Sequence, residues 1–143
     1  AYTRLLDLGV EEFLINAALV SVVAQRLVRK LCDCAIVDEE ASEKLSRLNL
    51  KKLYDGLAIE TKPQLKMPIG CEKCSNTGYK GRVAITEYLE CDDNIRSMSK
   101  TSTFITKAQA HNKQLGFRTL LEDGLYKARA GITSLEEVIR VAG

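Results

Sequence analysis

The sequence predicts a small α/β fold whose middle is fastened at a four-cysteine metal site. Two close cysteine pairs, Cys32/Cys34 and Cys71/Cys74, frame a charged central segment. The segment Arg82–Leu89 is rich in β-branched residues, which is typical of a strand. On both sides of these features, apolar residues recur at helical spacing. With 143 residues, the chain is long enough to bury a core without disulfide bonds.

The composition is that of a globular domain with almost balanced charge. The formal net charge is +2 and aromatic residues make up 6% of the chain, which argues against a nucleic-acid-binding surface. The cysteine count is odd, at 5, and no segment resembles a secretory signal peptide. We therefore expect a reducing cytoplasm, in which thiols are free to bind metal. The longest apolar stretch, Phe13–Val23, is shorter than the roughly 20 residues that a membrane-spanning helix needs.

The first part of the chain, Thr3–Lys30, is apolar and compatible with a helix. Glu11 and Glu12 suit the positive end of a helix whose apolar positions continue from Phe13. The segment Val22–Arg29 fits either a continuing helix or a buried strand, and periodicity does not decide between them. The chain begins without an initiator methionine, so we expect it to be part of a longer protein.

The segment between the cysteine pairs, Val37–Leu65, is strongly charged and carries leucines at helical spacing. We expect one or two short helices here, with Asp38 as a cap and a break at Thr61-Lys62-Pro63. So short a segment buries too little apolar surface to fold alone. A metal ion at its neck would stabilise it, because structural zinc contributes roughly 10–16 kcal/mol of apparent binding energy.

After the second cysteine pair the sequence predicts the strand Arg82–Leu89 and then helices only. Gly131 and the capping box that begins at Thr133 place the start of the last helix. The predicted helices run from an Asp92 or Asp93 cap through Met98, over Phe104–Leu115, along the apolar positions between Phe117 and Ala128, and from Thr133 to Val141.

The four cysteines Cys32, Cys34, Cys71 and Cys74 are the candidate metal ligands, and zinc is the metal that four thiolates favour. The alternative is that they are small buried apolar residues. Only Asp33 separates the first pair, where two residues are usual. Either this pair chelates with altered geometry, or Asp33 or water replaces one thiolate. We expect the fifth thiol, Cys91, to be a buried structural residue.

The residues predict no catalytic group and no cofactor-binding group other than the metal ligands. The only histidine, His111, lies in a polar helical stretch and is expected at the surface. Neither a serine-nucleophile motif nor a phosphate-binding loop is present in the sequence, so we expect the chain to be inactive alone. Arg26 lies in an apolar segment and should have a carboxylate, phosphate or backbone partner.

Taken together, the motifs resemble the C-terminal part of the ATPases that power type II secretion and type IV pilus assembly. Glu122-Asp123-Gly124-Leu125 favours the type II members. The stretches that carry the resemblance are Arg4–Leu14, Ala24–Cys32, Gly70–Cys74, Thr77–Arg82, Glu87–Leu89, Gly116–Leu120, Glu122–Leu125 and Gly131–Val141.

The resemblance implies the end of a RecA-like ATPase core, built on an antiparallel strand pair with helices. Residues 1–31 would be the last part of that core, a helix followed by a strand. Residues 32–75 would be an inserted tetracysteine metal-binding subdomain. Residues 76–91 would be the returning core strand, and residues 92–143 a C-terminal helical subdomain.

The resemblance also implies a function for the full-length parent. That parent would be a cytoplasmic homohexamer, peripheral to the inner membrane, that hydrolyses ATP with Mg²⁺ and acts on an inner-membrane secretion platform. It would reach the membrane through partners and bind no nucleic acid. The present chain would supply a structural zinc arm and coupling helices, while the phosphate loop lies upstream. The alternative function is a small zinc-ribbon module that binds nucleic acid or a protein.

Overall fold

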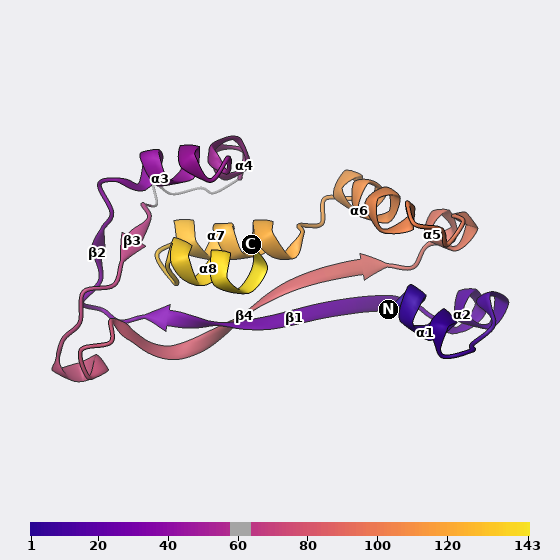
Figure 1. Cartoon of the computed structure of the whole chain (residues 1–143), viewed down its shortest axis with the longest axis horizontal. Coiled ribbons are helices and arrows are strands. Elements are labelled where there is room, and N and C mark those ends of the chain that lie inside the picture. Colours follow the sequence, from indigo (N-terminus) through magenta and orange to yellow (C-terminus); the bar gives the residue numbers. More distant parts are fainter. Residues whose placement is uncertain (58–63) are drawn as a thin grey trace. The chain divides into compact units, whose positions relative to one another are not determined.

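The computed structural model describes residues 1–57 and 64–143 (Figure 1). The helix break expected at Thr61–Pro63 lies outside the described residues. The chain forms two compact units, which are described separately. The first unit contains residues 1–24 and 87–119, and the second contains residues 25–86 and 120–143.

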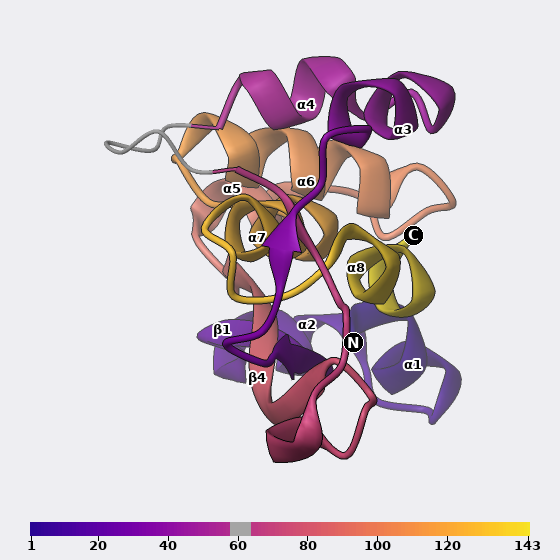
Figure 2. The ribbon, with the colours of Figure 1, turned by 90° about the vertical axis from the view of Figure 1, so that its left-hand side faces the viewer.

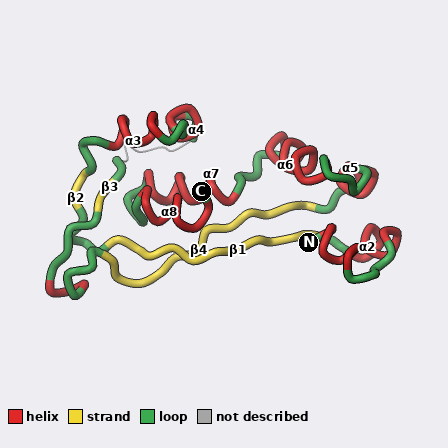
Figure 3. The backbone as a smooth tube through the Cα atoms, viewed as in Figure 1, coloured by secondary structure: helices red, strands yellow, loops and turns green. Residues whose placement is uncertain are grey.

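Two long strands, β1 (Ser21–Leu31) and β4 (Tyr79–Glu90), are neighbours in a two-stranded sheet (Figure 3), and their arrows in Figure 1 point in opposite directions. The strand alternative for Val22–Arg29 is therefore the right one, which agrees with the preference of its valines for extended backbone. The predicted strand Arg82–Leu89 is confirmed and is longer at both ends.

The first unit adds four helices to its part of the strands, with a shared apolar core. Asp92 caps α5 as expected, because its carboxylate accepts a hydrogen bond from the Ile95 amide at 2.9 Å. The helices are α1 (Tyr2–Asp7), α2 (Glu12–Ala18), α5 (Asp93–Ser97) and α6 (Phe104–Gln114). The core residues are Tyr2, Ile15, Cys91, Ile95, Phe104 and Ala108.

In the second unit, the segment between the cysteine pairs begins and ends in a short two-stranded sheet. The strands β2 (Ile36–Val37) and β3 (Lys66–Met67) pair antiparallel, with Ile36 opposite Met67. They lead to the helices α3 (Ala41–Arg47) and α4 (Lys51–Asp55), as Figure 2 shows. We call this segment, residues 35–70, the insert.

The chain ends in two helices of the second unit, α7 (Leu120–Arg129) and α8 (Leu135–Ala142). These helices and the insert share one apolar core, so the insert does not bury its apolar side chains alone. The core residues are Leu45, Leu57 and Leu65 from the insert region, and Leu125, Ala128, Leu135 and Val138 from the helices.

Two predicted caps are wrong in position. Ser134, not Thr133, caps α8, and its hydroxyl accepts a hydrogen bond from the Glu137 amide at 3.2 Å. The Thr133 hydroxyl instead donates a hydrogen bond to the Arg29 carbonyl of β1 at 2.7 Å, and it makes no capping hydrogen bond to α8. Asp38 lies before the N-cap of α3, where its carboxylate accepts from the Glu40 amide at 3.0 Å.

Within the described residues, no helix combines the length and the apolar character that a membrane span requires.

Candidate metal centre

The four candidate sulfur atoms lie together at one end of the long strands, within 4.8 Å of one another. The Sγ–Sγ distance is 3.8 Å between Cys32 and Cys71, 4.0 Å between Cys34 and Cys74, and 3.8 Å between Cys71 and Cys74. A tetrahedral zinc ion with Zn–S bonds of about 2.3 Å places its ligands about 3.8 Å apart. The donor set and its spacing therefore fit zinc. We call these four residues the metal centre.

Two different backbone structures bring the thiols together. Cys32 follows the last residue of β1, and its amide donates to the Gly78 carbonyl at 3.0 Å. Cys71 is the N-cap and Cys74 the last residue of the 3-10 turn η1 (Glu72–Cys74), in which the Cys74 amide donates to the Cys71 carbonyl. The sulfur atoms of both Cys32 and Cys34 therefore lie in the cluster, although only one residue separates them. Asp33 is not among the four clustered residues.

Gly78 shows why the Thr77-Gly78 pair follows the second cysteine pair. Its φ of +82° lies in the region that favours glycine, and a Cβ there would overlap Pro68. From this position the Gly78 amide donates to the Cys74 sulfur at 3.2 Å. The Cys71 amide donates to the same sulfur, also at 3.2 Å. The turn is therefore built to place backbone dipoles on a thiolate.

Backbone amides, burial and the neighbouring thiols give two of the four cysteines opposite pKa shifts. Burial opposes the thiolate of Cys74, but the amides of Cys71 and Gly78 outweigh it and lower the pKa of Cys74 to about 6. The Gly70 amide acts in the same direction on Cys34, but burial and the neighbouring thiols raise the pKa of Cys34 to about 11. The Cys74 thiol is ready to bind metal near neutral pH, whereas the Cys34 thiol would release its proton to solvent when the ion binds.

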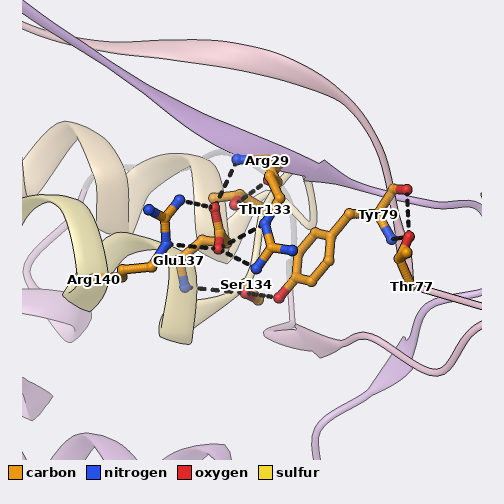
Figure 4. A network of polar contacts seen from close by, with 7 residues as sticks. All are labelled: Arg29, Thr77, Tyr79, Thr133, Ser134, Glu137 and Arg140. Carbon is orange, nitrogen blue, oxygen red and sulfur yellow. Dashed lines mark hydrogen bonds and ion pairs between the residues drawn. The ribbon is translucent and has the colours of Figure 1, made fainter.

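A polar network holds α8 to the strands beside the metal centre (Figure 4). The buried Glu137 carboxylate accepts from the Arg29 amide at 2.8 Å, from Arg29 Nη2 at 2.7 Å and from Arg140 Nη2 at 2.8 Å. The Arg29 guanidinium lies 4.2 Å from the centroid of the Tyr79 ring, and the Tyr79 hydroxyl contacts Ser134 Oγ at 2.7 Å. Burial alone would raise the pKa of Glu137, but the two arginines lower it to about 2.

Sequence reasoning missed this network, although part of the signal was present. Glu137 stands beside Val138 on a helix that packs against apolar residues, and a carboxylate in such a place needs a cationic partner. Arg140, three residues further along the same helix, is a partner that helical spacing offers. Arg29 could not be chosen by sequence, since the chain contains 21 lysines and arginines.

The other residues singled out by sequence are not members of the metal centre. Cys91 is 2% exposed, as expected of a structural thiol. The surface prediction for His111 is wrong, because its side chain is 17% exposed and its Nε2 lies 2.7 Å from the Asp92 carboxylate. That contact arises because Asp92 projects from the start of α5 toward α6. Arg26 has the backbone partner that was one of its expected alternatives, the Val141 carbonyl at 3.0 Å.

These features define an α/β protein with a candidate four-cysteine metal site. The site lies at the base of an insert that shares a core with the last two helices. Comparison with known proteins then gives the family. Residues 1–140 match the family described as "Type II/IV secretion system protein". The chain belongs to this family.

Type IV pilus assembly ATPases and type II secretion system ATPases both resemble the chain along almost its whole length. It is 45% identical to the type IV pilus assembly ATPase PilB of Thermus thermophilus over 147 residues, which covers 97% of this chain and 15% of that protein. It is 42% identical to the type II secretion system ATPase E of Vibrio cholerae over 144 residues, covering 99% and 27%. It is 37% identical to the type IV pilus assembly ATPase TfpB of Acinetobacter baylyi, covering 97% and 23%.

The chain therefore spans between 15% and 27% of the length of these relatives. The preference for the type II members, which rests on Glu122–Leu125, stays a prediction, because relatives of both kinds match at similar identity.

Proposed function

We propose that this chain is the C-terminal part of an ATPase for type II secretion or type IV pilus assembly, and that its own contribution is a structural zinc arm. The observation that carries the proposal is the metal centre, with four sulfur atoms within 4.8 Å of one another in a chain of this family. In this role Cys32, Cys34, Cys71 and Cys74 hold zinc, and no residue of the chain acts in catalysis.

Zinc would supply a tetrahedral cross-link between the end of β1 and the turn before β4. The surrounding residues support such a link, because the Cys71 and Gly78 amides already stabilise negative charge on Cys74. The Arg29–Glu137 network fixes α8 on the strands beside it. The cross-link would keep the insert at a constant position on the last two helices, with which it shares a core.

The finer parts of the proposal follow from family membership. Residues 1–31 and 76–91 would close a RecA-like core, residues 32–75 would form the zinc subdomain, and residues 92–143 the C-terminal helical subdomain. The intact protein would work as a cytoplasmic homohexamer, with ATP and Mg²⁺ bound by residues upstream of this chain. It would meet the inner-membrane secretion platform through partner proteins.

Metal content tests the proposal directly. Native mass spectrometry of the chain is expected to find one zinc ion per molecule, and the double substitution Cys71→Ser with Cys74→Ser should abolish it. Cys91→Ala is the matched control, since Cys91 lies in the core of the other unit and should leave zinc content unchanged.

Two results would count against the zinc arm. One is a native chain, purified without chelator, that carries no zinc. The other is a full-length relative with both serine substitutions that still assembles and secretes at the normal rate, which would make the zinc dispensable for function.

A further inference from the structure

We propose that three arginine side chains of the second unit form a docking site for an acidic peptide segment of another polypeptide. Arg29 from β1, Arg82 from β4 and Arg140 from α8 line a hollow of ≈ 510 Å³, together with Leu27 and Val28. We call this the arginine hollow. Its lining residues include three arginines and no acidic residue, so it concentrates positive charge on a chain whose net charge is only +2.

The carboxylate behind the arginine hollow neutralises only part of this charge. Glu137 accepts hydrogen bonds from both Arg29 and Arg140, as Figure 4 shows, and its side chain is 2% exposed. The arginine side chains themselves remain 50% and 58% exposed. Glu137 thus fixes the two guanidinium groups from the inside and leaves their outer N–H groups free to meet a ligand from solvent.

Arg82 supplies the third positive charge of the arginine hollow. It is exposed on β4, and within residues 1–57 and 64–143 its guanidinium has no hydrogen-bond or ion-pair partner. Three guanidinium groups facing one hollow repel one another, and an incoming carboxylate that bridges Arg82 and Arg140 removes that repulsion. Guanidinium forks match carboxylates with two parallel hydrogen bonds, so the chemistry favours arginine over lysine at such a site.

The apolar part of the lining points to a peptide rather than to a free anion. Leu27 is 49% exposed beside the arginines, and a phosphate ion has no group that would cover it. The hollow is also much larger than one small anion and falls within the size range of sites that hold organic ligands. A peptide that alternates acidic and apolar side chains satisfies both parts, with carboxylates on the arginines and an apolar side chain on Leu27.

The probe for the test is a fluorescein-labelled peptide of alternating glutamate and leucine, titrated with the chain while anisotropy is recorded. The native chain should bind it, and the same peptide with glutamine in place of glutamate should not bind. Arg82→Glu should weaken binding by about tenfold or more, because it places a carboxylate at the point of contact. Leu27→Ala should weaken it by about threefold through lost apolar contact.

Arg47→Glu is the matched control, because Arg47 is an exposed arginine of the same unit, lies on α3 and does not line the arginine hollow. It carries the same change in charge as Arg82→Glu and should alter binding by less than about twofold at physiological salt. Circular dichroism checks that both variants fold. The Nε–H signals of Arg29, Arg82 and Arg140 in nuclear magnetic resonance spectra should shift when the peptide is added.

Several results would overturn the proposal. Equal losses in the Arg82 and Arg47 variants would mean that only general charge attracts the peptide. If the glutamine peptide binds equally well, or if the acidic peptide does not bind, the ligand is not an acidic peptide. Full displacement by millimolar inorganic phosphate, with no effect of Leu27→Ala, would make the hollow a simple oxyanion site instead.

Discussion

At the scale of single residues, Glu137 is a buried carboxylate shared by two arginines. Its carboxylate is buried and accepts from two arginines, which hold its pKa at about 2 against an ordinary value of 4.5. Because the pKa is lower in the folded chain than in the unfolded one, this carboxylate stabilises the fold fully above pH 4.5. That contribution is lost as the pH falls from 4.5 toward 2.

We expect Glu137→Gln to lower the free energy of unfolding at pH 7 by about 3 kcal/mol, since it leaves two arginines without their shared partner. The variant should also lack the part of the acid destabilisation that Glu137 causes between pH 4.5 and pH 2. Urea unfolding at a series of pH values measures both effects.

Glu136→Gln is the control, because Glu136 is exposed and adjacent on the same helix. It should change stability by less than about 0.5 kcal/mol at pH 7. If the two variants have the same pH dependence, the assignment of the acid transition to Glu137 is wrong.

Sequence reasoning at this scale identified residue types well and contacts less well. The four thiols could be chosen because zinc ligands come in close pairs, and the structure brings their sulfur atoms together. The partner of His111 and the Arg29 partner of Glu137 lie 19 and 108 residues away along the chain, and no local pattern specifies them. Thr133 and Ser134 are both able to cap a helix, and only the neighbouring β1 carbonyl decides between them.

At the scale of elements, the crossing of α7 and α8 depends on Gly124. A Cβ built on this residue would lie 2.7 Å from Val138 Cγ1, which is closer than real carbon atoms approach. Gly124 therefore allows α7 and α8 to pack closely against each other. Asp123 on the same helix adds a second attachment, because its carboxylate accepts from the Thr86 amide of β4 at 2.9 Å.

Two effects of opposite sign act in Gly124→Ala. Alanine favours the helix by about 1 kcal/mol over glycine, whereas overpacking costs about 1–3 kcal/mol. We expect a net loss of about 1 kcal/mol or more in the free energy of unfolding, measured by urea denaturation. In a Val138→Ala background, where the clashing methyl groups are absent, Gly124→Ala should be neutral or stabilising. A stabilising effect in the native background would contradict the close crossing.

The sequence predicted the helices and strands better than it predicted individual contacts. The strand at Arg82–Leu89 and the helices after it follow from side-chain shape and apolar spacing, which are local properties. The segment Val22–Arg29 could not be assigned by periodicity, because its strand conformation depends on pairing with β4.

At the scale of the whole molecule, the chain divides into two compact units, and both long strands take part in both. The insert belongs to the second unit, because its Leu45 packs in one core with Val138 of the last helix. The predicted domain boundaries at residues 31, 75 and 91 remain a prediction. Sequence alone could not show that the insert and the last helices share a core, because the residues concerned are far apart in the chain.

Metal removal should therefore affect the two units differently. After treatment with a chelator, we expect amide hydrogen exchange to accelerate in the second unit, including at Leu45 and Val138, because the insert loses its cross-link. Exchange at Cys91 and Ile95 in the first unit should change much less. Added zinc should restore the original rates. Equal acceleration in both units, or none, would contradict a local role for the metal.

The long strands have one further consequence, which concerns alignment. β1 and β4 are 11 and 12 residues long, and no short turn joins them to fix which residues face each other. A slip of one strand by one residue would turn its buried side chain, Val28 of β1 or Ile85 of β4, outward and would move Cys32 away from Gly78. The metal centre accepts only the native alignment, because its four sulfur atoms must meet within one coordination sphere. The proposed zinc ion would thereby select a single strand register and reject its neighbours.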